Sequence, residues 1–103
     1  MDTDNLSILT YRDIITEAER FNHNLTLQFG ILASECKNDD DYLNKSEAII
    51  KQWLSENNTG IVAADIFYGE DINLDAFRTI LKKLLSNIAK IRKTPMKERT
   101  YEA

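Results

Sequence analysis

The residues of this chain that could act as a nucleophile or a soft metal ligand are one histidine and one cysteine. His23 and Cys36 are the only residues of their types, and such a pair can form an activated thiolate. On one continuous helix they would lie about 20 Å apart, so a sharp bend would be needed. A zinc site would need further ligands at close spacing, which the sequence lacks. We therefore expect no metal, no cofactor and no catalytic residue, with His23 at a bend and Cys36 as a small buried side chain.

Two groups of carboxylates are also candidates for metal binding or acid–base chemistry. Residues 39–41 (DDD) resemble the start of a calcium loop, but Leu43 occupies a position where that loop needs an oxygen ligand. Asp13 and Glu17 would share one helix face, yet no Glu-x-x-His motif accompanies them. Helix capping explains the three aspartates, and a solvated helix start explains Asp13 and Glu17.

Asp65 lies in the most apolar stretch of the chain, GIVAADIFYG at residues 60–69, where a charge must be paired or exposed. With Trp53 and Tyr68 it forms the candidate pocket for a small ligand or a substrate. The alternative is that Asp65 faces solvent on a helix while the aromatic side chains belong to the core. Periodicity leaves residues 61–68 open between helix and strand.

The strongest pattern is a separation of charge along the chain. Residues 1–77 contain 15 acidic and five basic residues, a net charge of −10, whereas residues 78–103 contain two acidic and eight basic residues, a net charge of +6. On a helical projection, a set of cations falls opposite the apolar stripe of the last long helix. These candidate partner-binding residues, which we call the basic face, are Arg78, Lys82, Lys83, Lys90 and Lys93.

Three explanations of the basic face remain open. It can be the solvated side of a bundle helix that acidic helices balance at long range. It can bind an acidic protein partner, or the acidic half of a second copy, through complementary charge. It can also contact nucleic-acid phosphates, although the overall net charge of −4 and the lack of aromatic residues between the lysines disfavour this.

Helical periodicity extends through most of the chain, and only three glycines and one proline are present, which is few for the turns of a β-rich domain. Asn73 is expected to cap the last long helix, and Pro95 is expected to end it. The predicted helices span residues 10–36, 41–57 and 74–92, with a short apolar segment at 61–68.

The first of these helices is too long for a domain of this size. Residues 10–36 would form a helix about 40 Å long, whereas a chain of about 100 residues has a radius of gyration near 13 Å. The helix must therefore bend, at residues 22–24 or at Gly30, or protrude from the bundle. Residues 25–31 also alternate as a strand would. A protruding helix would expose apolar side chains that a second copy could cover, so we predict a homodimer through this helix.

Length and composition set the broad class of protein. With 103 residues, 43% hydrophobic and 29% charged, the chain has room for one folded domain. A single cysteine excludes an intrachain disulfide. No apolar run approaches the roughly 20 residues that span a bilayer. We expect a cytoplasmic protein that does not enter a membrane.

These patterns predict an all-α fold, a small helical bundle of three long helices plus a short connecting helix. We expect a flexible N-terminus at residues 1–9, a single helical domain at 10–93 and a flexible basic C-terminal tail at 94–103. The predicted function is a non-catalytic interaction or regulatory module that binds a protein partner or itself. Two alternatives are a nucleic-acid-associated protein that uses the basic C-terminal helix and a small-ligand binder or enzyme with a pocket near Asp65.

Overall fold

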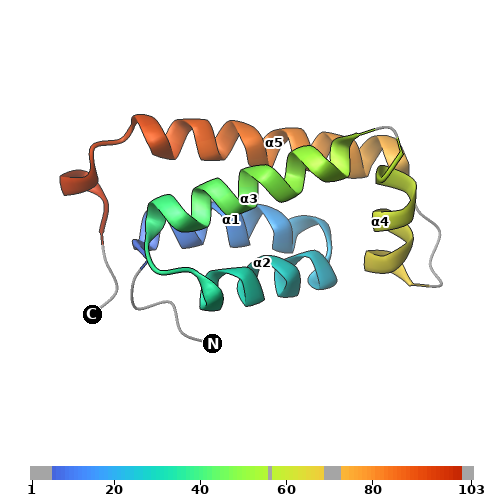
Figure 1. Cartoon of the computed structure of the whole chain (residues 1–103), viewed down its shortest axis with the longest axis horizontal. Helices are drawn as coiled ribbons and strands as arrows, with labels where there is room; N and C mark the ends of the chain where they lie inside the picture. Colours follow the sequence, from blue (N-terminus) through green and yellow to red (C-terminus); the bar gives the residue numbers. More distant parts are fainter. Residues whose placement is uncertain (1–5, 56, 69–72, 101–103) are drawn as a thin grey trace.

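A computed structural model of the chain describes residues 6–55, 57–68 and 73–100. The all-α prediction is confirmed, since the regular elements in these ranges are helices and none is a β-strand. Figure 1 shows α4 closing one end of the bundle, across the ends of the longer helices. The elements are α1 (Ile8–Phe21), α2 (His23–Glu35), α3 (Asp39–Leu54), α4 (Thr59–Phe67), α5 (Leu74–Lys93) and a short 3-10 helix (Met96–Glu98).

The long first helix that we expected is two helices, α1 and α2, which fold back along each other (Figure 1). Asn22 separates them, with an extended backbone (φ −163°, ψ 135°). Its side-chain oxygen accepts hydrogen bonds from the backbone N–H groups of Asn24 at 2.8 Å and Leu25 at 3.3 Å, which caps α2. The bend therefore lies at residues 22–24, and Gly30 lies inside α2. Because the helix folds back, the length argument for a homodimer no longer applies.

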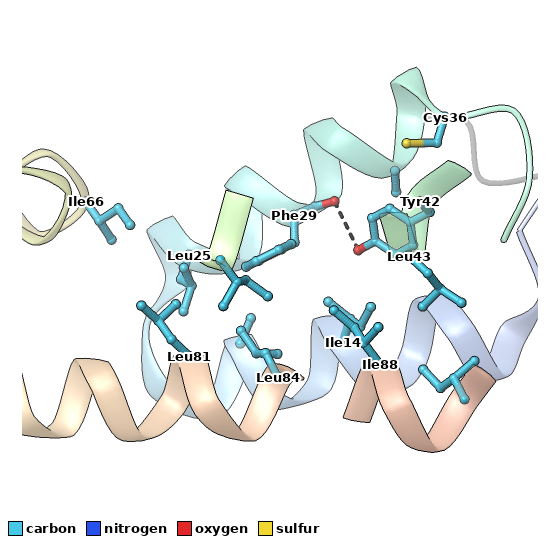
Figure 2. Close-up of a cluster of buried hydrophobic side chains, with 14 of the residues drawn as sticks. Ile14, Leu25, Phe29, Cys36, Tyr42, Leu43, Ile66, Leu81, Leu84 and Ile88 are labelled. Carbon is cyan, nitrogen blue, oxygen red and sulfur yellow. Dashed lines mark hydrogen bonds between the residues drawn. The ribbon is translucent and has the colours of Figure 1, made fainter. Parts of the chain in front are cut away.

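All five α-helices contribute buried side chains to the core, and α5 contributes a continuous stripe to it (Figure 2). Burial of one large aliphatic side chain in such a stripe stabilises the folded state by roughly 1.5 to 3 kcal/mol, because its apolar surface is removed from water. As predicted, Asn73 caps α5, its side chain accepting a hydrogen bond from the backbone N–H of Ala76 at 3.0 Å. The stripe consists of Phe77, Leu81, Leu84, Ile88 and Ile91, each at most 1% exposed.

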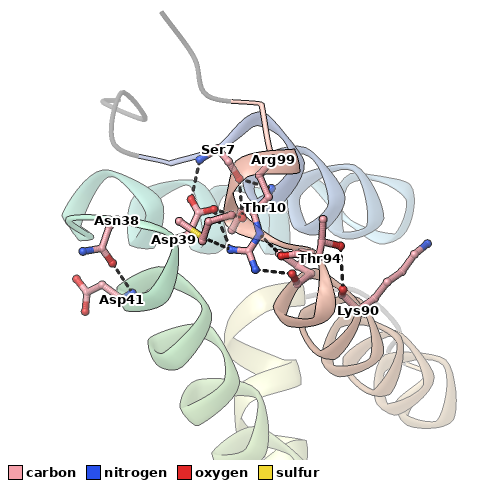
Figure 3. A network of polar contacts seen from close by, with 10 residues as sticks. Ser7, Thr10, Asn38, Asp39, Asp41, Lys90, Thr94 and Arg99 are labelled. Atoms are coloured by element: carbon pink, nitrogen blue, oxygen red, sulfur yellow. Dashed lines mark hydrogen bonds and ion pairs between the residues drawn. The ribbon is translucent and has the colours of Figure 1, made fainter.

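A buried ion pair closes the end of the bundle opposite α4. The carboxylate of Asp39 accepts hydrogen bonds from the backbone N–H of Ser7 at 2.6 Å and the hydroxyl of Thr10 at 2.7 Å. It also pairs with the guanidinium of Arg99 at 3.2 Å (Figure 3). We call these four residues the Asp39–Arg99 network. It joins the start of α1, the start of α3 and the segment after α5.

Arg99 also completes the hydrogen bonding at the end of α5. Its guanidinium donates to the backbone carbonyls of Ile91, in the last turn of the helix, and of Thr94, at its C-cap, where backbone carbonyls run short of intrahelical donors. The Ile91 carbonyl also accepts from the Thr94 N–H. Arg99 is only 6% exposed, and Leu6 and Ser7 are also buried. The ends that we expected to be flexible, 1–9 and 94–103, thus contain buried residues, while 1–5 and 101–103 lie outside the described residues.

The Asp39 carboxylate links the stability of the fold to pH. Burial alone would raise the pKa of Asp39, but the hydrogen bonds from Ser7, Thr10 and Arg99 outweigh burial and hold the pKa below its ordinary value. A carboxylate whose pKa is lower in the folded than in the unfolded state stabilises the fold at pH values above its unfolded-state pKa. That stabilisation is lost as the pH falls through the folded-state pKa.

We therefore expect the free energy of unfolding to decrease as the pH falls from about 5 towards 2, and Asp39→Asn to lack this part of the pH dependence. Urea unfolding followed by helical circular dichroism at several pH values measures both. Asp65→Asn is the matched control, because Asp65 is exposed. If Asp39→Asn showed the same pH dependence as the wild type, the network would not be the source of the acid sensitivity.

Removal of the Arg99 side chain, the other partner of the ion pair, should lower the free energy of unfolding at neutral pH. Arg99→Ala leaves Asp39 buried without its cation and removes one of the two donors to the Ile91 carbonyl, the other being the Thr94 N–H. We expect a loss of about 3 kcal/mol in the free energy of unfolding. Lys97→Ala, at an exposed cation two residues away, should change stability little. The two variants are compared by urea unfolding at pH 7, and equal losses would contradict a structural role for Arg99.

Candidate functional site

His23 and Cys36 are kept apart in the structure. His23 is the first residue of α2 and is exposed, whereas Cys36 follows the last residue of the same helix and is buried. Burial raises the pKa of the Cys36 thiol, and nearby Asp41 raises it further. Among the residues that the structure describes, no three His, Cys, Asp or Glu side chains gather closely enough to hold a metal ion.

The candidate pocket residues Trp53, Asp65 and Tyr68 have different surroundings. The Trp53 ring packs against the rings of Phe29 and Phe77, with centroid distances of 5.9 and 6.5 Å. Asp65 is exposed, and Tyr68 is 87% exposed. Neither of the two hollows described below is lined by any of the three. The exposure of Asp65 and the packing of Trp53 match the alternative arrangement, in which the carboxylate faces solvent and the indole belongs to the core.

Aromatic rings fill the end of the core near α4. Phe77 of α5 lies at the centre of this cluster, with Phe67 of α4 at 5.8 Å and Phe21 of α1 at 6.2 Å. Phe67 and Phe21 also contact each other edge to face at 5.5 Å. Such ring pairs add to the free energy of burial and restrict side-chain orientation. Phe77 therefore fixes which side of α5 faces the core.

The basic face lies on the outer side of α5, and all five of its residues are exposed. Lys83, at one edge, pairs with Glu17 of α1, with 3.2 Å between its ammonium nitrogen and the carboxylate. Figure 3 shows the Lys90 side chain extending away from the helix. Within the described residues, four members of the face have no acidic partner within 4.0 Å: Arg78, Lys82, Lys90 and Lys93.

Polar contacts join the second half of α5 to the helices on either side of it. On the α3 side, Arg92 donates to Glu47 and Asn44, each at 2.7 Å, and its hydrogen bond to Glu47 lowers the pKa of that carboxyl. On the α1 side, the Asn87 side chain donates to the backbone carbonyl of Asp13 at 3.3 Å. Exposed ion pairs contribute less than about 1 kcal/mol each, so their main effect is to neutralise charge at the edges of the helix.

Two surface hollows flank α1. The first, about 370 Å³ between α1 and α2, is uncharged, and its exposed apolar side chains are Leu27 and Ile31. The second, about 310 Å³ between α1 and α5, is polar, and we call it the α1–α5 groove. The α1–α5 groove is lined by Arg12, Asp13, Thr16, Glu17, Arg20, Asn87 and Lys90.

Arg12 and Arg20 are not among the predicted binding residues, because they lie in the acidic part of the chain. Their spacing of eight residues, with Thr16 midway, places them on similar sides of α1, which is the signal that could have identified them. The structure adds them to Lys90, the member of the basic face that lines the same groove. The cationic surface therefore extends from α5 onto α1.

Comparison of the chain with protein-family models, with curated proteins and with solved structures finds no match. No helix within the described ranges combines the length and the apolar character needed to cross a membrane.

The two sides of α5 should respond differently to substitution. We expect Lys82→Glu combined with Lys93→Glu to leave the melting temperature within about 3 °C of the wild type. Both side chains are exposed and have no acidic partner in the part of the chain that the structure describes. Phe77→Ala should lower the free energy of unfolding by about 3 to 5 kcal/mol, because three rings lose contacts. Thermal and urea unfolding measure these effects. A large loss of stability in the lysine variant would assign those cations a structural role.

Proposed function

We propose that this chain is a non-catalytic interaction module whose basic face binds an acidic surface of a protein partner. The observation that carries the proposal is the group of four exposed cations that have no acidic partner among the described residues, on a protein whose net charge is −4. Complementary charge on a partner would speed association and fix its orientation. The proposal assigns the chain to the cytoplasm, where a lone cysteine stays reduced.

The position of α5 in the bundle supports this proposal. Its apolar stripe is buried, and the Asp39–Arg99 network holds the segment that follows it. The cations therefore project from a helix whose position is fixed, which limits the entropy lost when a partner binds. Arg78 and Lys93 are 15 residues apart, or about 22 Å along the helix axis. A complementary acidic surface would have a similar length.

Two features favour a protein partner over nucleic acid. Phe77, the aromatic residue of α5, is buried, so it cannot stack on bases. Asp75 is exposed in the first turn of the same helix, where a carboxylate would repel phosphate. Binding of a nucleic acid would also weaken steeply with salt, and a gel shift at low salt is the direct check.

Lysine-reactive cross-linking in the native host, followed by mass spectrometry, tests the proposal. We expect Lys82, Lys90 and Lys93 to form cross-links to a partner protein. Lys45 and Lys51 on α3, also exposed, serve as internal controls that should not. Cross-links to another copy of this chain would identify the partner as the chain itself, which light scattering of the purified protein would then show as a doubled mass.

Matched charge reversals provide the quantitative form of this test. Lys82→Glu with Lys93→Glu should weaken affinity for the cross-linked partner at least about tenfold. Lys45→Glu with Lys51→Glu changes the net charge equally and breaks only exposed pairs with Asp41 and Glu47, so we expect less than about a twofold effect. Isothermal titration with the purified partner measures both. An unchanged affinity in the α5 variant would disprove the proposal, and equal losses would indicate a general charge effect.

A further inference from the structure

We propose that the partner docks through an α-helix with two acidic stripes, which lies lengthwise in the α1–α5 groove. Arg12 and Arg20 would contact one stripe, and Lys83 and Lys90 would contact the other. This inference rests on the proposed function and specifies the chemistry of the partner, which the basic face alone leaves open.

Two contacts determine how the walls of the groove are aligned. Lys83 reaches Glu17 at 3.2 Å, and Asn87 reaches the backbone of Asp13 at 3.3 Å. Residue numbers thus rise along α5 as they fall along α1, so the two helices are antiparallel neighbours (Figure 1). The α1 residues that line the groove span residues 12–20, about 12 Å along the helix axis, so a docked helix can lie parallel to α1.

Both helices that form the groove carry cations. Arg12, Arg20 and Lys90 line the groove. Lys83, outside its lining, pairs with Glu17 inside it. Arg12 and Arg20 are eight residues apart on α1, or about 12 Å, and Lys83 and Lys90 are seven residues apart on α5, or about 10.5 Å. A helix is about 10 Å wide with its side chains, which suits the space above two adjacent helices. Acidic residues seven positions apart on that helix would recur every 10.5 Å or so, close to the spacing of both pairs.

The two acidic residues of the groove lie where α1 meets α5. Glu17 pairs with Lys83, and the backbone carbonyl of Asp13 accepts a hydrogen bond from Asn87. Thr16 and Asn87 add neutral polar groups to the lining. Glu17 is largely buried and has cations on both sides, Lys83 at 3.2 Å and Arg20 at 3.8 Å. A partner must therefore carry acidic groups at its flanks and hydrogen-bond donors or basic groups between them.

This mixed charge selects a protein helix over a polynucleotide. A phosphodiester backbone carries a negative charge at every nucleotide, so it would bring some of that charge against Asp13 and Glu17. A helix can divide its side chains into separate stripes, because residues three and four apart share a side. Since the groove is lined by polar residues, little apolar area would be buried, and the affinity would be largely electrostatic and sensitive to salt.

A synthetic probe tests the proposed chemistry without the native partner. The probe is a fluorescein-labelled, alanine-based helical peptide of about 21 residues with glutamates in two flanking stripes and lysines between them. A peptide of the same composition with the charges mixed around the helix is its control. Fluorescence anisotropy should show at least about tenfold tighter binding of the two-stripe peptide, weakening steeply between about 50 and 300 mM sodium chloride. Equal binding of the two peptides, or tighter binding of a single-stranded oligothymidylate, would overturn the inference.

Variants of α1 separate this inference from the proposed function. Arg12→Glu with Arg20→Glu should weaken binding of the two-stripe peptide and of the native partner at least about tenfold, whereas Lys45→Glu with Lys51→Glu should have less than about a twofold effect. Circular dichroism checks folding. Arg12→Glu alone repeats the test if the double variant does not fold, because Arg12 has no acidic partner within 4.0 Å among the described residues.

The outcomes for the native partner then distinguish the two proposals. If Lys82→Glu with Lys93→Glu abolishes binding while the α1 variant binds normally, the partner uses the basic face but not the groove, and only the inference fails. If neither variant changes binding, both the inference and the proposed function fail. Comparable losses in both variants, with normal binding by the α3 control, support both.

Discussion

The burial of one stripe of α5 against its neighbours is the constraint on which the rest of the structure depends. This helix contacts α1, α3 and α4, and its largest buried side chain, Phe77, packs against rings from three other elements. Because successive residues differ by about 100° around a helix, a shift of one position would bring charged side chains into the core. The outward direction of the cations is therefore a consequence of core packing, and the same helix provides both the centre of the fold and the candidate binding surface.

The parts of the fold that follow from local pattern could be predicted from the sequence. The stripe and the Asn73 cap of α5 are encoded within one segment, so periodicity and capping chemistry are sufficient. The division between α1 and α2 is harder, since both helices bury apolar residues at the same spacing and the pattern continues through the break. What ends α1 is the extended backbone of Asn22 and its two side-chain hydrogen bonds. The sequence could place a bend at residues 22–24 or at Gly30, but it could not choose between these two sites or between a bent helix and a straight one that protrudes.

The candidate site likewise has one part that local sequence predicts and another that depends on contacts between distant residues. Exposure of the basic face could be read from a helical projection, but the contribution of Arg12 and Arg20 depends on how α1 lies beside α5, and that alignment is set by contacts across more than 60 residues. Arg99 shows the dependence on distant contacts most clearly. It lies in a segment without apolar periodicity, and its guanidinium is buried against the carboxylate of Asp39, 60 residues earlier in the chain. A long-range ion pair of this kind leaves no periodic signal.

The Asp39–Arg99 network also brings the two ends of the described chain to one place. The backbone N–H of Ile8 donates to the carbonyl of Thr100, so the polypeptide enters and leaves the bundle at the same corner, opposite α4. A short peptide bridge between these positions would turn the chain into a ring with a small loss of loop entropy. Because these two positions are adjacent, the bundle is suited to circular permutation or to insertion within a loop of another protein.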